Sequence, residues 1–248
     1  MTLLVVLLLS APGHASPAQE AFEAGVTASR DGDNAAAVEH FVDALDHGGR
    51  DPAVYHGLGN ALFRQGHNGH AIAAWTRGLE LAPTDGDLSA NRALALSKTR
   101  DRLELPRPPT GPFFWQAFVP VRTEALLAGL AAALGLWVQL IQGIADRRRR
   151  RAIRRRWEAA VLVGIGLVLA ASARHHLSRP PPATVLTPEV RVRSALGAEG
   201  VDLFVLHEGA VVQTLEVYED ADTAAVLVAL PDDRKGWVPR SAVDIADP

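Results

Sequence analysis

Tyr55-His-Gly-Leu58-Gly59-Asn60-Ala-Leu62 is the stretch of sequence that decides the fold of the first part of the chain. It is followed by Gly66, Ala71, Trp75 and Pro83. Similar residues stand 34 positions earlier, where Gly25, Gly32, Ala37 and Phe41 align with Gly59, Gly66, Ala71 and Trp75. A period of this length is typical of stacked helix pairs, in which each repeat is one helix–turn–helix unit.

This spacing resembles the tetratricopeptide repeat family, which has aromatic, Leu-Gly, Ala and Pro residues at the matching positions. The resemblance implies a domain over residues 16–104, with repeats at 18–51 and 52–85 and a capping helix at 86–102. Gly59 and Ala71 are expected where the two helices of a repeat cross, because larger side chains would separate them. Two repeats and a cap form a short stack, so we expect a further contact to contribute to its order.

The resemblance also indicates where a ligand would bind, because this family uses the groove along the first helices of its repeats. The side chains expected there are His56, Asn60, Phe63 and Arg64, with Asn91 and Arg92 nearby on the capping helix. Asparagine and arginine together suit a peptide carboxylate or backbone. The alternative is that these side chains are ordinary surface residues of a repeat.

Two later segments are predicted to form a transmembrane hairpin, with spans at residues 124–145 and 157–174. Residues 125–145 are 21 positions without a charge, and at ~1.5 Å per residue they reach across the ~30 Å hydrocarbon core. The second segment has 15 uncharged residues, 159–173. It spans only if Trp157 and Arg174 lie at the interfaces, and a buried helix of a soluble domain is the alternative.

The loop between these segments, residues 146–156, is strongly basic, whereas the flanking domains are acidic. It holds eight arginines: Arg147, Arg148, Arg149, Arg150, Arg151, Arg154, Arg155 and Arg156. Each would cost ~2.5–3.5 kcal/mol at the bilayer centre, so we expect a cytoplasmic topology anchor whose partners are anionic lipid headgroups. A nucleic-acid site is the alternative, and the adjoining apolar segments argue against it. Both folded domains would then be extracytoplasmic, on a multi-pass protein of the bacterial cytoplasmic (inner) membrane.

Residues 1–15 are predicted to be a secretory signal peptide. An apolar run ends at Gly13-His-Ala15, with small residues at the two cleavage-specifying positions. A retained anchor is the alternative, because no Lys or Arg precedes the run. Residues 105–123 form a linker rich in proline and aromatic residues, in which Phe113-Phe-Trp115 suits the headgroup interface.

After a stiff spacer at residues 175–182, the periodicity changes to two. Residues 183–248 hold short alternating runs such as Val190-Arg-Val-Arg193, separated by turn residues, which predicts a small all-β barrel. The segments Val192-Arg-Ser194, Leu206-His-Glu-Gly209 and Gly236-Trp-Val238 resemble the bacterial Src homology 3 (SH3) family. That resemblance implies that Trp237 is buried in the core, and a ligand-binding Trp237 is the alternative.

The sequence contains no complete catalytic or cofactor site. There is no cysteine, which excludes disulfides, thiolate metal sites and a cysteine nucleophile. His207 beside Glu208 is only a weak acid–base pair. The His67/His70 and His175/His176 pairs have no third metal ligand placed by spacing. We therefore expect a protein that is not an enzyme and has no cofactor and no metal.

The order of these parts resembles the BatE family of bacterial aerotolerance (Bat) operon proteins, a multidomain architecture of signal peptide, tetratricopeptide repeats, membrane hairpin and SH3-like barrel. The resemblance implies a non-enzymatic adaptor of the cell envelope. Its repeats would bind membrane proteins, including von Willebrand A domain proteins of the same operon type, and its barrel would bind a protein or peptidoglycan. The alternative is a wall-associated sensor that signals through the arginine loop. A hydrolase that uses His207 and Glu208 is a third hypothesis.

Overall fold

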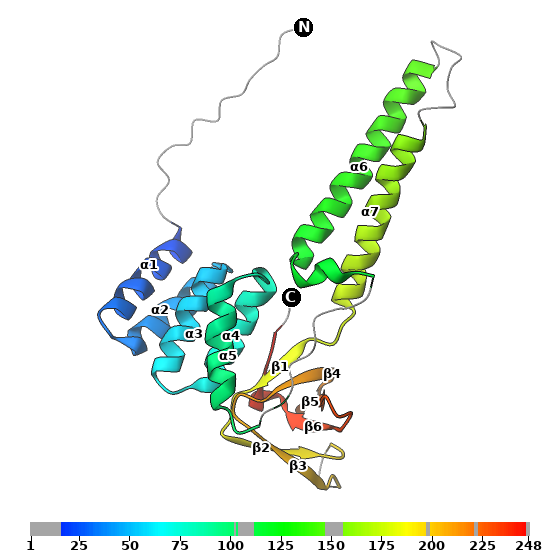
Figure 1. The fold of residues 1–248 in the computed structure, drawn as a ribbon. Coiled ribbons are helices and arrows are strands. Elements are labelled where there is room, and N and C mark those ends of the chain that lie inside the picture. Colours follow the sequence, from blue (N-terminus) through cyan, green and yellow to red (C-terminus); the bar gives the residue numbers. More distant parts are fainter. Residues whose placement is uncertain are drawn as a thin grey trace.

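The computed structural model of the chain describes residues 16–101, 103, 112–146, 156–196, 199–220 and 223–246. Within them it has a helical repeat region, two long apolar helices and a C-terminal antiparallel sheet, as the sequence predicts (Figure 1). The predicted signal peptide lies outside the described residues. So do the arginines at positions 147–151, 154 and 155, whereas Arg156 begins the second long helix.

Five helices build the repeat region: α1 (Pro17–Arg30), α2 (Asn34–Asp46), α3 (Pro52–Arg64), α4 (Asn68–Leu81) and α5 (Gly86–Lys98). Four of them begin at a polar side chain that accepts a hydrogen bond from the first turn, namely Ser16, Asp33, Asp51 and Asp85. Gly32 and Gly66 follow the first helix of each pair with φ of 82° and 88°. Glycine adopts this conformation without a steric cost, so it ends both helices at equivalent places.

The recurring glycines of the two repeats lie beneath aromatic rings. A Cβ atom on Gly25 would lie 2.9 Å from the ring of Phe41, and one on Gly59 would overlap the indole of Trp75. Both residues are almost completely buried, since only 1% of the surface of Phe41 and 1% of that of Trp75 is exposed. Each repeat therefore packs an aromatic ring of its second helix onto a glycine of its first, which explains the 34-residue recurrence of this pair.

The two long helices, α6 (Val121–Asp146) and α7 (Arg156–Leu177), lie side by side along their length (Figure 1). A Cβ atom on Gly135 would lie 2.8 Å from the Val163 side chain, and one on Gly166 would lie 3.1 Å from the carbonyl oxygen of Ala128. Both glycines thus allow close backbone approach. Residues 121–142 and 159–177 are long and apolar enough to cross a membrane, by length and composition.

A short 3₁₀ helix, η1 (Phe114–Ala117), is fastened to the base of this hairpin by hydrogen bonds. Trp115 Nε1 donates to Glu124 Oε1 at 2.5 Å. Gln116 Nε2 donates to the carbonyl oxygen and the hydroxyl of Ser172, at 2.8 and 2.9 Å. Glu124, which the sequence placed at the edge of the span, lies in the first turn of α6 and is fully buried.

The C-terminal part is one sheet of seven strands in the order β3-β2-β6-β5-β4-β1-β7. The strands are β1 (Pro182–Val185), β2 (Glu189–Arg193), β3 (Asp202–His207), β4 (Val211–Glu219), β5 (Ala224–Ala229), β6 (Lys235–Pro239) and β7 (Val243–Ile245), with η2 (Arg240–Ala242) before β7. The prediction of a barrel is wrong, because β3 and β7 are the two edges of this sheet and do not pair in the described residues. Alternating residues specify which face of a strand is buried, but not whether two edges meet.

The β7 edge is covered by the repeat region. Arg77 Nη2 on α4 donates to Asp244 Oδ1 at 2.6 Å and to the carbonyl oxygen of Ile245 at 3.2 Å. Val211 of β4 belongs to the same buried apolar cluster as Ile72 on α4. A helix therefore protects this edge in place of barrel closure.

The turn between β3 and β4 completes the contact between the sheet and the repeats. The backbone N–H of Gly69, in the first turn of α4, donates to Glu208 Oε1 at 2.7 Å. Because α4 makes no cap with the side chain of its own His67, Glu208 caps this helix from a distant part of the sequence. Asp101 accepts from the backbone N–H of His207 at 2.6 Å and lies 2.9 Å from its Nδ1. His207 and Glu208 thus join the sheet to the repeats.

We expect Glu208→Ala to destabilise the protein by about 1 kcal/mol, because α4 loses its only side-chain cap in the described structure. The measurement is the midpoint of chemical unfolding of the full chain in mild detergent. Glu199→Ala, which removes an exposed carboxylate just before β3, is the control and should leave the midpoint unchanged. Equal midpoints for the two variants would show that the cap contributes nothing.

Candidate functional site

Four of the ligand residues predicted from the sequence surround one small cavity, which we call the repeat cavity. It has a volume of about 230 Å³ and is lined by Asn60, Phe63, Arg64, Trp75, Asn91 and Leu94. Three of these residues come from α3 and two from α5. The repeat cavity therefore lies between the first helix of the second repeat and the capping helix.

His56, a fifth predicted residue, holds two of the cavity's side chains in place. Its Nε2 atom lies 3.3 Å from Asn60 Nδ2 and 3.1 Å from Asn91 Nδ2. Asn91 Nδ2 also donates to Asn60 Oδ1 at 3.0 Å. Both amide nitrogens are donors, so His56 Nε2 takes part as the acceptor. This network links α3 to α5 and fixes both asparagines before any ligand arrives.

One side of the repeat cavity is cationic and aromatic. Arg64 Nη1 donates to the hydroxyl of Ser29 at 3.0 Å. Lys98 Nζ lies 4.5 Å from the centroid of the Phe63 ring, and that centroid is 5.7 Å from the centroid of Trp75. Two cations close to an apolar ring suit a ligand that carries a carboxylate and an apolar side chain.

Lys98 does not line the repeat cavity but contacts its Phe63, and the sequence analysis missed it. It lies seven positions after Asn91 on α5, and residues seven apart share one face of a helix. The helical spacing from Asn91 was therefore a signal that could have found it. The sequence gives no comparable signal that its ammonium group would lie over Phe63, which belongs to α3.

Arg92, the sixth predicted residue, is not among the residues that line the repeat cavity. Its guanidinium interacts electrostatically with Glu80 on α4. Burial lowers the pKa of Arg92, and the charge of Glu80 partly opposes this shift. Burial likewise raises the pKa of the Glu80 carboxyl, and the charge of Arg92 partly opposes that shift. Arg92 is thus an electrostatic partner of α4 in the described structure.

The raised pKa of Glu80 predicts a pH-dependent stability. The folded protein binds this proton more tightly than the unfolded chain, so the stability it contributes is present below the ordinary carboxyl pKa and is lost as the pH rises through the folded-state pKa. At neutral pH, Glu80→Gln should therefore raise the thermal unfolding midpoint, because glutamine removes a charge that burial disfavours.

This gain should disappear in acid, where Glu80 is protonated in both states. Glu39→Gln, at an exposed position of α2, is the matched control and should show no such trend. A Glu80→Gln protein less stable than the wild type at neutral pH would mean that the attraction to Arg92 outweighs the burial of the carboxylate.

A second surface lies on the outer face of the sheet. The prediction that Trp237 is a core residue is wrong. Its neighbours in β6, Gly236 and Val238, are buried, whereas Trp237 points to the opposite face of the sheet and is only partly buried. Its ring centroid lies 6.4 Å from that of Tyr218, in an edge-to-face arrangement. Its cross-strand partner in β2 is Arg193.

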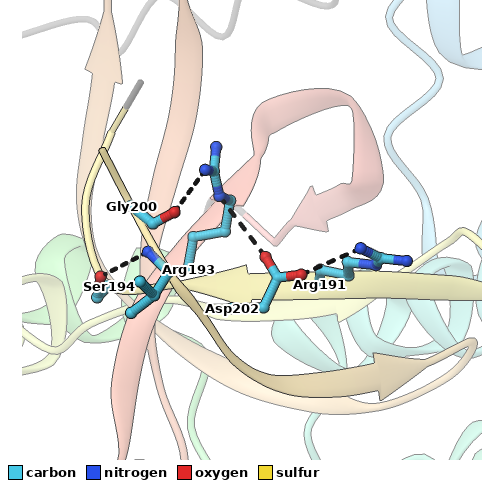
Figure 2. A network of polar contacts seen from close by, with 6 residues as sticks. Arg191, Arg193, Ser194, Gly200 and Asp202 are labelled. Carbon is cyan, nitrogen blue, oxygen red and sulfur yellow. Dashed lines mark hydrogen bonds and ion pairs between the residues drawn. The ribbon is translucent and has the colours of Figure 1, made fainter. Parts of the chain in front are cut away.

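A polar network fixes the β2–β3 hairpin (Figure 2). Arg193 of this network pairs with Trp237 across the strands. Arg193 Nη2 donates to the carbonyl oxygen of Gly200 at 2.6 Å, and its Nε lies 3.7 Å from Asp202 Oδ1. Arg191 Nη1 donates to Asp202 Oδ2 at 3.1 Å. The Arg191 side chain is 69% exposed and that of Asp202 is 47% exposed, so this network is solvated and contributes little to stability by itself.

The repeat cavity and the sheet face hold cations, amides and aromatic rings. In the part of the chain that the structure describes, no three His, Asp or Glu side chains gather so that they could hold a metal ion. The His67 and His70 rings, 5.9 Å apart, lie at the start of α4 beside the Glu208 contact. Neither the repeat cavity nor the sheet face brings together a nucleophile and a base among the described residues that line them.

Comparison with known families identifies the second repeat. Residues 52–85 match the tetratricopeptide repeat model, over the same bounds as the second predicted repeat and around α3 and α4. No curated protein matches the chain. Tetratricopeptide repeats are protein-interaction modules and are typically non-enzymatic, so the match supports the binding of protein partners. The resemblances to the Bat operon and SH3 families stay predictions.

Proposed function

We propose that this protein is a membrane-anchored adaptor that binds an extended segment of a protein partner in the repeat cavity. The observation that carries the proposal is the meeting of Asn60, Arg64 and Asn91 around one cavity of a tetratricopeptide repeat. The partner segment would carry a carboxylate, from an acidic side chain or a chain end, next to an apolar side chain. Binding alone is sufficient for this role, so the protein acts without catalysis.

Each part of the repeat cavity has a distinct task in this proposal. Arg64 uses one of its five N–H donors for Ser29, so it retains a pair of donors for a carboxylate. Lys98 adds a second cation near Phe63. Phe63 and Leu94, which is 50% exposed, offer apolar surface. The asparagines would bond the partner's backbone, and their network with His56 lowers the entropy lost on binding.

The anchor in this proposal is the hairpin of α6 and α7. Its support is the length and apolar composition of both helices and the arginines between them, which favour a cytoplasmic loop. In that orientation the repeats and the sheet lie on the extracytoplasmic side of a bacterial inner membrane, which agrees with a cleaved signal at residues 1–15. The base of the hairpin, with Trp115 bound to Glu124, would lie at the outer headgroup interface.

The finer parts of the proposal rest on family resemblance. A Bat-type complex would supply von Willebrand A domain proteins as partners of the repeat cavity. The SH3-like resemblance would assign a protein or peptidoglycan to the sheet, and the part-buried Trp237 with Tyr218 is the surface that suits such a ligand. A sensor that signals through the arginine loop is the second candidate, and it requires a cytoplasmic partner that changes with a stimulus.

The repeat cavity is tested by recovering proteins that copurify with the tagged full-length chain from mildly solubilised membranes. We expect the double variant Asn60→Ala/Arg64→Ala to lose its protein partners at least about tenfold, because removing charge-assisted bonds at a desolvated contact costs ~1.5–3 kcal/mol. Circular dichroism should show that helicity is unchanged.

The control for this experiment is Arg50→Ala, which removes an exposed arginine from the loop between α2 and α3. It should keep every partner. If the double variant also keeps them, the repeat cavity is not the binding site. If the wild type recovers only wall fragments, the sheet face becomes the better candidate for the functional surface.

The orientation can be tested by thiol labelling because the chain has no native cysteine. Single cysteines at Ser97 and Ser241, both exposed, should react with a membrane-impermeant maleimide in spheroplasts. A cysteine at Ala152, within the arginine loop, should react only after the membrane is broken. Labelling of Ala152→Cys in intact spheroplasts would reverse the proposed orientation.

A further inference from the structure

A long apolar groove runs along one side of the hairpin of α6 and α7. Its volume is about 800 Å³, within the ~300–1,000 Å³ range of ligand pockets. Its walls are apolar and include Ala132 on α6 and Val163 and Leu167 on α7. A Cβ atom added to Gly129, on the α6 side, would meet nothing within 4 Å. The groove is therefore open at Gly129.

One end of this groove is cationic. Arg174 and Ser178 belong to its lining, and Arg174 is exposed at the end of α7. Arg122 stands exposed at the start of α6, at the same end of the hairpin. Glu124, the acidic residue of this end, is fully buried by its contact with Trp115 and lines a separate cavity. The apolar groove thus opens onto positive charge.

The stretch of the groove between its inner end and Arg174 corresponds to one leaflet of a bilayer. On α7 the lining extends from Val163 to Leu177, and the part from Val163 to Arg174 is about 16 Å of helix at 1.5 Å per residue. Half of a ~30 Å hydrocarbon core is about 15 Å. An occupant that enters at Arg174 would therefore end near the bilayer centre.

We propose that this groove binds one acyl chain of an anionic phospholipid, whose phosphate is held by Arg174. The proposal rests on the proposed membrane anchoring of the hairpin. Its ligand class follows from an apolar groove that reaches one leaflet deep from Arg174, a cation near its outer end. A transmembrane helix of a partner fits less well, because such a helix crosses both leaflets and would need an apolar face along the whole hairpin, without a cation at its edge.

The bound lipid would have a structural consequence for the adaptor. Arg174 lies one turn before Ser178, where the chain leaves α7 and enters β1 at Pro182. A headgroup on Arg174 would therefore hold the point at which the sheet joins the membrane. Charge at this position is worth about 1 kcal/mol near an anionic surface.

The test uses the full-length chain in phosphatidylcholine vesicles that contain a trace of either phosphatidylglycerol or phosphatidylcholine with a photoreactive acyl chain. Cross-linked residues are identified by mass spectrometry, so labelling in the groove is separated from labelling near the arginine loop. In the wild type we expect phosphatidylglycerol to label groove residues about fivefold more than phosphatidylcholine, the ratio that corresponds to ~1 kcal/mol.

Two variants address the two parts of the site. Gly129→Leu fills the open space and should suppress groove labelling by both lipids, while Arg174→Gln should remove the preference and leave equal labelling. Gly164→Leu is the matched control, because a Cβ atom there also meets nothing within 4 Å but this residue lines the separate cavity. It should behave as the wild type.

Equal labelling of the wild-type groove by the two lipids would overturn the proposal, and so would unchanged labelling in Gly129→Leu. A groove that stays unlabelled while other residues of α6 and α7 are labelled would also overturn it, and would leave the groove to an occupant other than a lipid. If neither α6 nor α7 is labelled anywhere, the hairpin is not in the bilayer and the membrane anchoring itself is wrong.

Discussion

The hydrogen bond from the Gly69 N–H to Glu208 is the contact on which the arrangement of the folded parts depends. The N-terminus of α4 carries unpaired N–H groups and a partial positive charge, and its own His67 leaves them uncapped. The Glu208 carboxylate, in the turn before β4, accepts from one of these N–H groups and places a negative charge at this helix end. The sheet therefore docks at a helix end that would otherwise lack a side-chain cap. Two further contacts join the same parts, between Asp101 and His207 and between Arg77 and Asp244.

The helix that receives this carboxylate is also the centre of the repeat region. One side of α4 places Trp75 on Gly59 and forms the floor of the repeat cavity. Another side places Ile72 and Arg77 against the sheet. A stack of two repeats and a cap exposes one side of its last complete helix pair, and the sheet covers part of it. The docked sheet thus supplies the further contact that a short repeat stack requires.

The sequence predicted those features that arise within one element or one repeat. The 34-residue period located Gly59, Gly66 and Trp75 because ring-on-glycine packing recurs with the repeat. The helical hairpin followed from the length of its uncharged segments, and the strands followed from alternation. Of the predicted ligand residues, Asn60, Phe63, Arg64 and Asn91 line one cavity, and their role in binding stays a prediction. These predictions need only local periodicity and one known repeat geometry.

The features that the sequence did not predict all depend on contacts between distant elements. Trp237 faces outwards because β6 pairs with β5 on one side and β2 on the other, and a shift of one residue would have reversed its face. The sheet stays open because α4 covers its β7 edge, which no alternation encodes. His207 and Glu208 looked like an acid–base pair because they are adjacent, yet their partners stand 106 and 139 residues away.

In the proposed membrane-anchored adaptor, the docked arrangement also determines how a bound partner would be presented to the membrane. Only residues 178–181 separate the end of α7 from β1, and β1 lies between β4 and β7 in the sheet and itself packs against α4. The repeat cavity is therefore connected to the hairpin through two packed interfaces and a four-residue, proline-containing segment with few conformations. A protein held in this cavity would keep a defined distance from the bilayer. A flexible linker of the same length would allow many orientations and would lower the effective concentration of the partner at the membrane surface.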